Sequence, residues 1–318
     1  MKAALIGCGN IASRWIRSLL ADQRLDFAVL VDPDQGAARA LADRYALRLA
    51  FATTLDEALA IAPVDVVVNL TPPDHHYRIS RAALSRGLHV LTEKPLALGL
   101  ADALDLVHLA QERGLQLAVM QNRGADPGFL AFRDAVHASG TPPFVVTADT
   151  LVTLPAAGFR TSQSLLVTAD LAVHAFDQIR ALITAAPTEV TCTETPVVFL
   201  APHSSIAVIT IRFADGSLFT YRGGFIADPS LRTDANGDWR VEGQGFAARW
   251  TPEPTGRSAG PPAYQQCITT MVDALHRAAD GPVIAANNLG SIALLDAVLS
   301  SATERRPVSV PEVPDVRP

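Results

Sequence analysis

Lysine is almost absent from this chain of 318 residues. Lysine and arginine together number 26, and because Lys2 and Lys94 are the only lysines, the other 24 are arginine. Arginine stays protonated at any working pH, whereas a partly buried lysine can give up a proton. A lysine where arginine is the default therefore makes Lys94 a candidate for proton transfer. The alternative is a solvated lysine at the end of a strand.

Cysteine is also scarce, and its spacing excludes two classes of protein. Cys8, Cys192 and Cys267 are far apart, odd in number and form no CxxC pair. This pattern argues against a disulfide framework or a zinc site and favours a reducing compartment. The apolar stretch before Cys8 is only a few residues long, too short for a secretion signal. We therefore expect a cytoplasmic protein.

The sequence has neither a long apolar run nor an excess of positive charge. No apolar stretch approaches the roughly 20 residues that cross a membrane. The formal net charge is −6, which gives no electrostatic footprint for nucleic acid. We expect neither a membrane nor a nucleic-acid partner, and the remaining class of partner is a small-molecule substrate.

The first 120 residues alternate apolar strands with helices. Continuous apolar strands between helices are typical of a parallel sheet covered on both faces, and right-handed crossovers make it a doubly wound Rossmann fold. The predicted strands are Ala3–Ile6, Phe27–Val31, Val64–Leu70, Leu88–Leu91 and Leu117–Met120, and the helices are Ile11–Leu20, Ala37–Tyr45, Asp56–Ile61, Ile79–Leu84 and Ala101–Glu112.

A glycine-rich loop joins the first predicted strand to the first helix. Gly7 permits a tight turn, Gly9 lets the backbone approach a pyrophosphate, and Ala12 is small enough for close packing of helix and strand. With Asn10 and Ile11, this loop would hold the phosphates at the helix N-terminus. The alternative is a turn that merely needs two glycines.

Asp32 ends the second predicted strand, about 20 residues after the loop, which strengthens the dinucleotide fingerprint. Its carboxylate can accept hydrogen bonds from the adenosine ribose. Asp34 adds a second negative charge that would repel a 2′-phosphate, and only Arg39 lies nearby as a compensating cation. The sequence therefore favours NAD over NADP.

Thr71 and Pro72 follow the third strand and open the segment that contains His75 and His76. A pair of prolines at this point predicts an abrupt exit that leaves backbone groups facing the crevice. As alternatives, the segment is a turn with two solvated histidines, or a metal site. No further ligands cluster nearby, so we predict no metal.

From Asn122 onward the pattern changes to consecutive strands with short turns. We expect an α+β domain with a mostly antiparallel open sheet, so that residues 1–121 form one domain and 122–318 the other. The predicted strands are Phe144–Val152, Glu189–Leu200, Ser205–Phe213, Ser217–Phe225 and Trp239–Trp250; the helices are Phe129–Ala138, Leu165–Ala185, Tyr264–Ala279 and Leu289–Thr303, with a loop at Pro252–Pro262.

One helix of the second half carries a polar stripe. Asp170, His174 and Asp177 are spaced i, i+4 and i+7, which places them on one face of an otherwise apolar helix. An aspartate one turn before a histidine can orient the imidazole for proton work. A stripe that simply faces solvent is the alternative.

These motifs together resemble the glucose–fructose oxidoreductase / inositol dehydrogenase (Gfo/Idh/MocA) family of NAD(P)-dependent oxidoreductases. The resemblance rests on Gly7-x-Gly9-x-x-Ala12, Thr71-Pro72 with His76, Glu93-Lys94-Pro95, and Asp170-x-x-x-His174-x-x-Asp177. It implies that Lys94 and His174 face the nicotinamide and substrate, with Asp170 beside them. It also implies that Thr71, Pro72, His76, Glu93 and Asn122 border the cofactor and that Arg123 enters the substrate cleft.

The resemblance implies hydride transfer between the nicotinamide and a secondary alcohol or anomeric carbon of a sugar, inositol or related polyol. His174 or Lys94 takes the hydroxyl proton, and Asp170 orients His174; the residues leave open which cation is the base. Alternatives are a cofactor sensor without turnover, and a reductase or transferase that uses the nicotinamide transiently. Retention of Lys94, Asp170 and His174 together argues against the sensor.

The chain departs from the family pattern in two places. A glycine pair that often precedes the helix aspartate is Leu165-Leu166, and a Gly-x-x-Gly is Gly140-Thr141-Pro142-Pro143. Both could reshape the substrate pocket.

The sheet of the second domain is expected to form subunit contacts. In the family this sheet commonly does so, and Ser205–Phe213 alternates apolar Ile206, Val208 and Phe213 with few charges. We expect a homodimer or homotetramer through this sheet.

Overall fold

The computed structural model describes residues 1–153, 160, 164–197, 204–225, 232–252, 261–277 and 283–316. It forms two compact units. The first comprises Met1–Met120, Gln265–Leu289 and Asp315–Pro318, and the second Gln121–Tyr264 and Gly290–Pro314.

The first unit is a parallel sheet of six strands in the order β3-β2-β1-β4-β5-β6, the doubly wound Rossmann arrangement that the apolar runs predict. The strands are almost entirely buried because helices cover the sheet. They are β1 (Lys2–Ile6), β2 (Asp26–Val31), β3 (Ala50–Ala52), β4 (Val66–Asn69), β5 (His89–Thr92) and β6 (Leu117–Val119).

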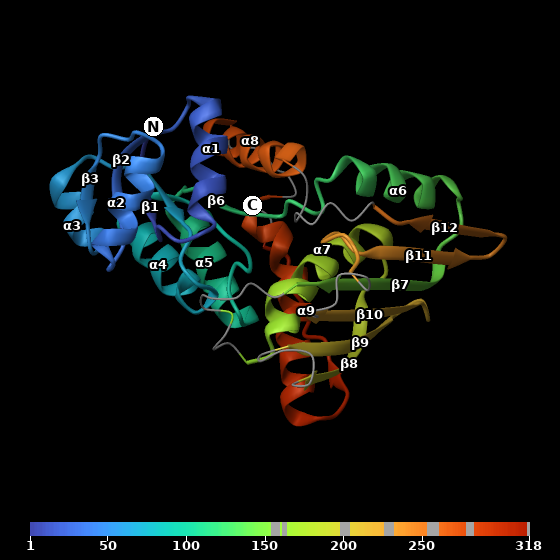
Figure 1. The fold of residues 1–318 in the computed structure, drawn as a ribbon. Coiled ribbons are helices and arrows are strands. Elements are labelled where there is room, and N and C mark those ends of the chain that lie inside the picture. The colour runs from blue at the N-terminus through green and yellow to red at the C-terminus, as the bar shows by residue number, and fades with distance from the viewer. Residues whose placement is uncertain are drawn as a thin grey trace. The chain divides into compact units, whose positions relative to one another are not determined.

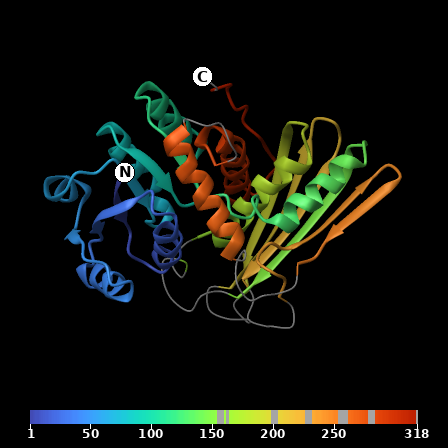
Figure 2. The same ribbon diagram turned by 90° about the horizontal axis from the view of Figure 1, so that it is seen from above.

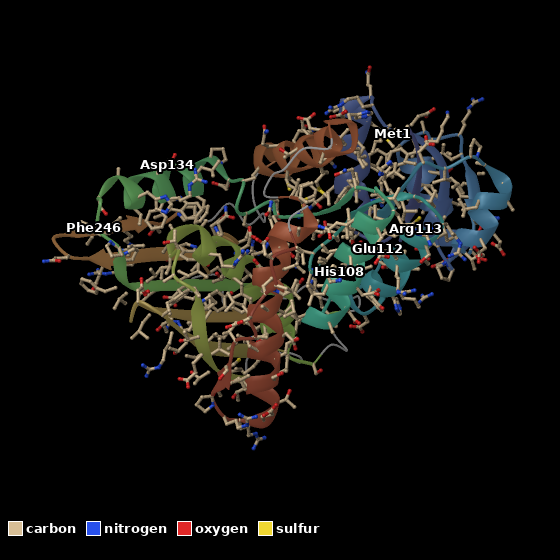
Figure 3. All side chains as sticks on the ribbon, turned by 180° about the vertical axis from the view of Figure 1, so that it is seen from behind. Met1, His108, Glu112, Arg113, Asp134 and Phe246 are labelled. Carbon is tan, nitrogen blue, oxygen red and sulfur yellow. The ribbon has the colours of Figure 1, made fainter. Side chains whose placement is uncertain are left out.

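The helices of this unit are α1 (Ala12–Asp22), α2 (Gln35–Arg44), α3 (Leu55–Ile61), α4 (Pro73–Ser85), α5 (Leu100–Glu112) and α8 (Pro261–Arg277). α4 and α5 lie together on one face of the sheet, and α1 and α8 lie side by side on the other (Figures 1 and 2). A hydrogen bond of 3.2 Å from Gln265 Nε2 to the Ser18 carbonyl ties α8 to α1. On α5, His108 and Glu112 are exposed on the outer side, away from the buried strands (Figure 3).

The structure corrects two expectations in this unit. β3 was not predicted; it has three residues, its one partner among the described strands is β2, and it ends the strand order of the sheet. α4 begins at Pro73 instead of Ile79, because proline is well suited to the first helical position. His75 and His76 therefore lie in a helix and not in a turn.

The second unit contains a seven-stranded sheet in the order β12-β11-β7-β10-β9-β8-β13. β7 and β10 pair in parallel and all other neighbours are antiparallel, as the sequence predicts for a mostly antiparallel sheet. The strands are β7 (Pro143–Val152), β8 (Pro187–Pro196), β9 (Ser205–Phe213), β10 (Leu218–Phe225), β11 (Asp238–Gly243), β12 (Phe246–Trp250) and β13 (Val308–Ser309).

Helices pack on one face of this sheet (Figure 2). They are α6 (Pro127–Ala138), a π-helical segment η2 (Val167–Ala172) that continues into α7 (Val173–Leu182), and the long helix α9 (Ala285–Glu304). Phe129 of α6 lies 6.1 Å from Trp239 and 5.7 Å from Trp250, centroid to centroid. From α9, the Ser301 hydroxyl accepts a 3.0 Å hydrogen bond from the backbone N–H of Cys192 in β8.

The structure corrects two predictions for the second half, and parts of two others lie outside the described residues. The single strand predicted over Trp239–Trp250 is the hairpin β11–β12, and the loop predicted over Pro252–Pro262 falls largely outside the described residues, as do residues 198–200 of another predicted strand. Ile206, Val208 and Phe213 do not share a face: Val208 is 46% exposed, whereas Phe213 is 4% exposed and points to the helix-covered side. The period of two along a strand separates even from odd positions.

Candidate active site

The glycine loop of the first unit has the geometry that a dinucleotide requires. Gly7 has φ of +96°, and a Cβ atom there would lie 2.7 Å from the Leu70 carbonyl carbon. A Cβ at Gly9 would meet nothing within 4 Å, so space beside the backbone is open. Ile11 precedes α1 without a side-chain cap, and the helix N-terminus favours an anion. Asn10 is exposed and Ala12 is fully buried.

Asp32 is held beside this loop by backbone donors. The N–H of Cys8 donates to its Oδ2 at 2.8 Å, and the N–H of Asp34 donates to its Oδ1 at 2.8 Å. Asp34 itself caps α2, where its side chain accepts from the N–H groups of Gly36 and Ala37. The carboxylate of Asp32 is thus fixed at the end of β2, and Asp34 adds negative charge nearby.

These features fit a nicotinamide dinucleotide. The strand order reverses between β1 and β4, and ligands of doubly wound sheets bind outside the carboxyl ends of strands at such a reversal. The glycine loop follows β1, Thr71 follows β4 and Lys94 follows β5. The open space at Gly9 would leave room for the phosphates, and the Asp32 carboxylate would supply a ribose acceptor.

His76 connects the two loops that follow β4 and β5. It is 1% exposed, and its Nδ1 lies 2.6 Å from the Pro95 carbonyl while its Nε2 lies 2.7 Å from the Thr71 carbonyl. Burial lowers the pKa of His76, and the two carbonyls and the Glu93 carboxylate oppose this effect. The alternative of two solvated histidines is therefore wrong for His76, although His75 is exposed.

The Thr71-Pro72 segment is fixed by a side chain of β4. Asn69 Oδ1 accepts from the Thr71 hydroxyl at 2.7 Å and from the Thr71 N–H at 3.3 Å. Asn69 Nδ2 donates to the His76 carbonyl at 3.1 Å. Pro72 is exposed at the start of α4. The loop therefore has a set conformation beside the end of β4.

Glu93 is buried, whereas Lys94 is only partly so. One Glu93 oxygen accepts from the Trp15 indole N–H at 2.7 Å, and the other accepts from the Lys94 backbone N–H at 3.1 Å. Glu93 is 8% exposed. The backbone of Lys94 is therefore held in place by a buried carboxylate.

In the second unit Asp170 lies in the π-helical segment, a feature frequently found at functional sites. Its carboxylate pairs with Arg160 through two bonds, Nε to Oδ2 at 2.7 Å and Nη2 to Oδ1 at 3.1 Å. Such a bidentate pair fixes the geometry of the carboxylate as well as its charge. Asp170 is 5% exposed and His174 is 6% exposed, so the alternative of a solvent-facing stripe is wrong for both.

Arg123 lies in the same unit among buried groups. It is 5% exposed, as is Asn122. Burial lowers the pKa of the Arg123 guanidinium, while Tyr221 and the carboxylates of Asp170 and Asp234 oppose this. Burial also raises the pKa of Tyr221 to about 12. Arg123 and Asp170, both predicted site residues, therefore interact electrostatically within this unit.

Asp177, the third member of the predicted stripe, has a different environment. It accepts a 3.3 Å hydrogen bond from the Ser291 hydroxyl, which itself accepts from Arg180 at 3.0 Å. Burial raises the pKa of Asp177 to about 6, against the opposing effects of Arg180 and Ser291. Asp177 thus packs against α9 in a structural network.

Sequence reasoning missed three side chains. No periodic pattern surrounds Arg160 in the sequence. The one signal that could have suggested it is that a buried carboxylate, here Asp170, needs a cation as partner. Trp15 fits the apolar spacing of α1, so its polar N–H went unnoticed. Glu194 of β8 accepts from the N–H groups of Val167 and Thr168 at 2.9 and 3.0 Å and caps the helix that carries Asp170. Only the fold brings these segments together.

The described residues offer neither a metal site nor a membrane-spanning helix. They contain no group of three or more histidine, cysteine, aspartate or glutamate side chains placed to hold a metal ion. Within the same residues, no helix has the length and apolarity needed to cross a membrane.

The chain is similar in sequence to known oxidoreductases. Residues 1–121 match the oxidoreductase family GFO_IDH_MocA with an NAD-binding Rossmann fold. Inositol 2-dehydrogenase of Rhizobium meliloti is 24% identical over 338 residues, covering 98% of this chain and 99% of that protein. An uncharacterized oxidoreductase of Schizosaccharomyces pombe is 40% identical over 85 residues, covering 27% of this chain and only 23% of that relative's length.

The fold agrees over nearly the full length. The structure of GenD2 from gentamicin A biosynthesis in complex with NAD has a TM-score of 0.86 and 23% sequence identity, covering 98% of this chain and 97% of that one. Residues 1–121, with the glycine loop, Asp32 and the Glu93–Pro95 turn at the carboxyl ends of one parallel sheet, match the NAD-binding Rossmann domain of the Gfo/Idh/MocA oxidoreductase family.

Proposed function

We propose that this protein transfers a hydride between NAD and a secondary alcohol or anomeric carbon of a sugar, inositol or related polyol. The proposal rests above all on the position of Lys94. It follows the carboxyl end of β5, on the same side of the sheet where the glycine loop follows the carboxyl end of β1. The name of the Rhizobium meliloti relative, inositol 2-dehydrogenase, supports this substrate class. Bound NAD would supply the hydride acceptor at its nicotinamide ring.

The division of labour follows the two parts of the sequence. Residues 1–121 bind the cofactor through Gly7, Gly9, Asn10, Ile11 and Ala12, with Asp32 on the ribose and with Thr71, Pro72, His76 and Glu93 bordering the nicotinamide. Asn122, the first residue of the second part, borders the nicotinamide as well. Residues 122–318 bind the substrate, with Arg123 contributing a buried cation. Lys94 or His174 takes the hydroxyl proton, and the other cation stabilises the developing oxyanion.

Asp170 acts beside His174 in this proposal. Arg160 holds the Asp170 carboxylate by two hydrogen bonds. The guanidinium of Arg160 therefore positions the carboxylate that would stabilise His174. Arg123 adds a second positive charge near Asp170. In this proposal the Asp170 carboxylate, beside two guanidiniums, supports the imidazolium of His174 during proton transfer.

NAD is the preferred cofactor in this proposal, and NADP is disfavoured. Asp32 is fixed at the position of a ribose acceptor by Cys8 and Asp34, and a 2′-phosphate would meet both aspartates. We also propose a homodimer or homotetramer that forms through the open face of the second unit's sheet.

A screen of sugars, inositols and polyols with NAD, followed by NADH absorbance, tests the reaction. On an active substrate, Lys94→Arg and Lys94→Met should lower kcat by the roughly 10²–10⁴-fold typical of lost acid–base catalysis, because neither side chain can exchange the proton. Both variants should still bind NAD. His174→Asn should show a comparable loss, and the double variant should lose less than the product of the two single losses.

The chain offers a matched control for the lysine. Lys2, the only other lysine, lies on the surface and pairs with Asp26, so Lys2→Arg should keep wild-type turnover. A Lys94→Arg enzyme as active as Lys2→Arg would refute the role of Lys94. Tight NAD binding with no turnover on any compound of the screen would favour the cofactor sensor instead.

A further inference from the structure

The backbone of Lys94 is linked to the helix that follows the glycine loop. Trp15 lies in the first turn of α1, one turn after Ile11, and its ring is completely buried. Its indole N–H donates to Glu93 Oε1 at 2.7 Å. A buried indole N–H that lost this acceptor would keep its desolvation cost, so the bond sets where Glu93 lies.

Glu93 in turn fixes the backbone at Lys94. Its second oxygen, Oε2, accepts from the Lys94 backbone N–H at 3.1 Å, and its own N–H donates to the Asn69 carbonyl at 3.0 Å. The Glu93 carboxylate therefore links two elements: one oxygen accepts a hydrogen bond from α1, and the other accepts one from the turn after β5. On the far side of the turn, His76 Nδ1 lies 2.6 Å from the Pro95 carbonyl.

We propose that Trp15 is a positioning residue for Lys94 and acts through Glu93. The proposal rests on the function proposed for Lys94. Trp15 would not touch substrate; it would hold the Glu93 carboxylate so that the turn presents the Lys94 amine in one place. Because α1 begins at the phosphate-binding loop, the same helix would fix both the phosphate site and the catalytic lysine.

Trp15→Phe tests this role because it keeps a buried ring and removes only the N–H donor and part of the indole. The matched control is Leu19→Val, which shortens another fully buried side chain of α1. If Trp15 only fills the core, the two variants should behave alike. If it positions Lys94, only Trp15→Phe should loosen the turn.

The first measurement is hydrogen–deuterium exchange of peptides spanning residues 90–98 in the full-length protein. It needs no substrate, so it can fail or succeed independently of the proposed reaction. We expect Trp15→Phe to speed exchange of the Lys94 amide about tenfold, the factor that a hydrogen bond to a charged group supports, while Leu19→Val leaves it unchanged. Equal exchange in both variants would overturn the proposal.

The second measurement uses turnover on a substrate found in the screen. We expect Trp15→Phe to lower kcat about tenfold with little change in the KM for NAD, because the lysine is displaced while the phosphate site remains. In a Glu93→Ala background, Trp15→Phe should have no further effect on kcat. Independent, multiplying effects of the two substitutions would show that Trp15 does not act through Glu93.

Discussion

At the scale of single residues, Asp32 makes the cofactor preference testable. Two backbone N–H groups hold its carboxylate, and Asp34 adds negative charge beside it. Calorimetric titration should therefore show tighter binding of NADH than of NADPH to the wild-type protein. Asp32→Ser should weaken NADH binding, because the ribose acceptor is removed. It should also narrow the difference in affinity between NADH and NADPH, because one charge that repels the 2′-phosphate is removed. Equal or tighter NADPH binding by the wild type would refute the argument.

Residue identities alone could not predict how side chains meet across the fold. Gly7, Asp32 and Lys94 could be predicted as site residues from the sequence because local order fixes their places. Gly7 and Asp32 directly follow strands of a parallel sheet, and Lys94 follows one after a single intervening residue. Arg160 could not be predicted, because its partner Asp170 lies on a different element and no spacing links them. Leu165 has φ of +50°, so leucine adopts the left-handed conformation where the family pattern often has glycine, and sequence gives no sign of this.

At the scale of elements, the cap on the helix that carries Asp170 yields a stability prediction. Glu194 accepts from Val167 and Thr168 at the helix N-terminus, where a negative charge is favourable. Glu194→Gln removes that charge and one accepting oxygen, so we expect a loss of about 1–2 kcal/mol in the free energy of unfolding. Urea denaturation measures it.

The same strand provides the control for this experiment. Glu189 of β8 pairs with exposed Arg212 at 3.3 Å, and its own side chain is 44% exposed. Glu189→Gln should change stability by less than about 0.5 kcal/mol, because exposed ion pairs contribute little. A Glu194→Gln loss no larger than that of Glu189→Gln would show that the cap does not stabilise the helix.

The type of an element could be predicted from the sequence where its apolar pattern extended over many residues. The boundaries of the elements could not be predicted. The Rossmann strands appear as continuous apolar runs because both faces of the sheet are covered. β3 has only three residues, too few to show a period, and the turn between β11 and β12 includes Gly245 with φ of +78° inside what looked like one strand. Short elements depend on pairing with distant neighbours, which a local pattern does not contain.

At the scale of the whole molecule, the second unit's sheet has one face packed by helices and another that the described helices leave open. The register aligns Thr191, Thr210, Thr220 and Thr147 in one row of the open face. Val208 lies in the neighbouring row opposite Thr193 and Arg222. Arg222 is neutralised by Asp149 at 2.8 Å. Neutral hydroxyls, apolar groups and internally paired charges suit burial against a second subunit.

Val208→Glu tests the proposed assembly through this face. Val208 is 46% exposed in the single chain, so a glutamate there should leave the fold intact, but burying its charge between subunits would be costly. Light scattering at micromolar concentration should give the wild type a mass that is a multiple of 33.7 kDa. Val208→Glu should shift the mass toward 33.7 kDa, the value for one chain. Ile61→Glu, at a 53% exposed apolar position on α3, should leave the mass unchanged. A wild-type mass of one chain would end the proposal, and an unchanged mass for Val208→Glu would move the interface away from this face.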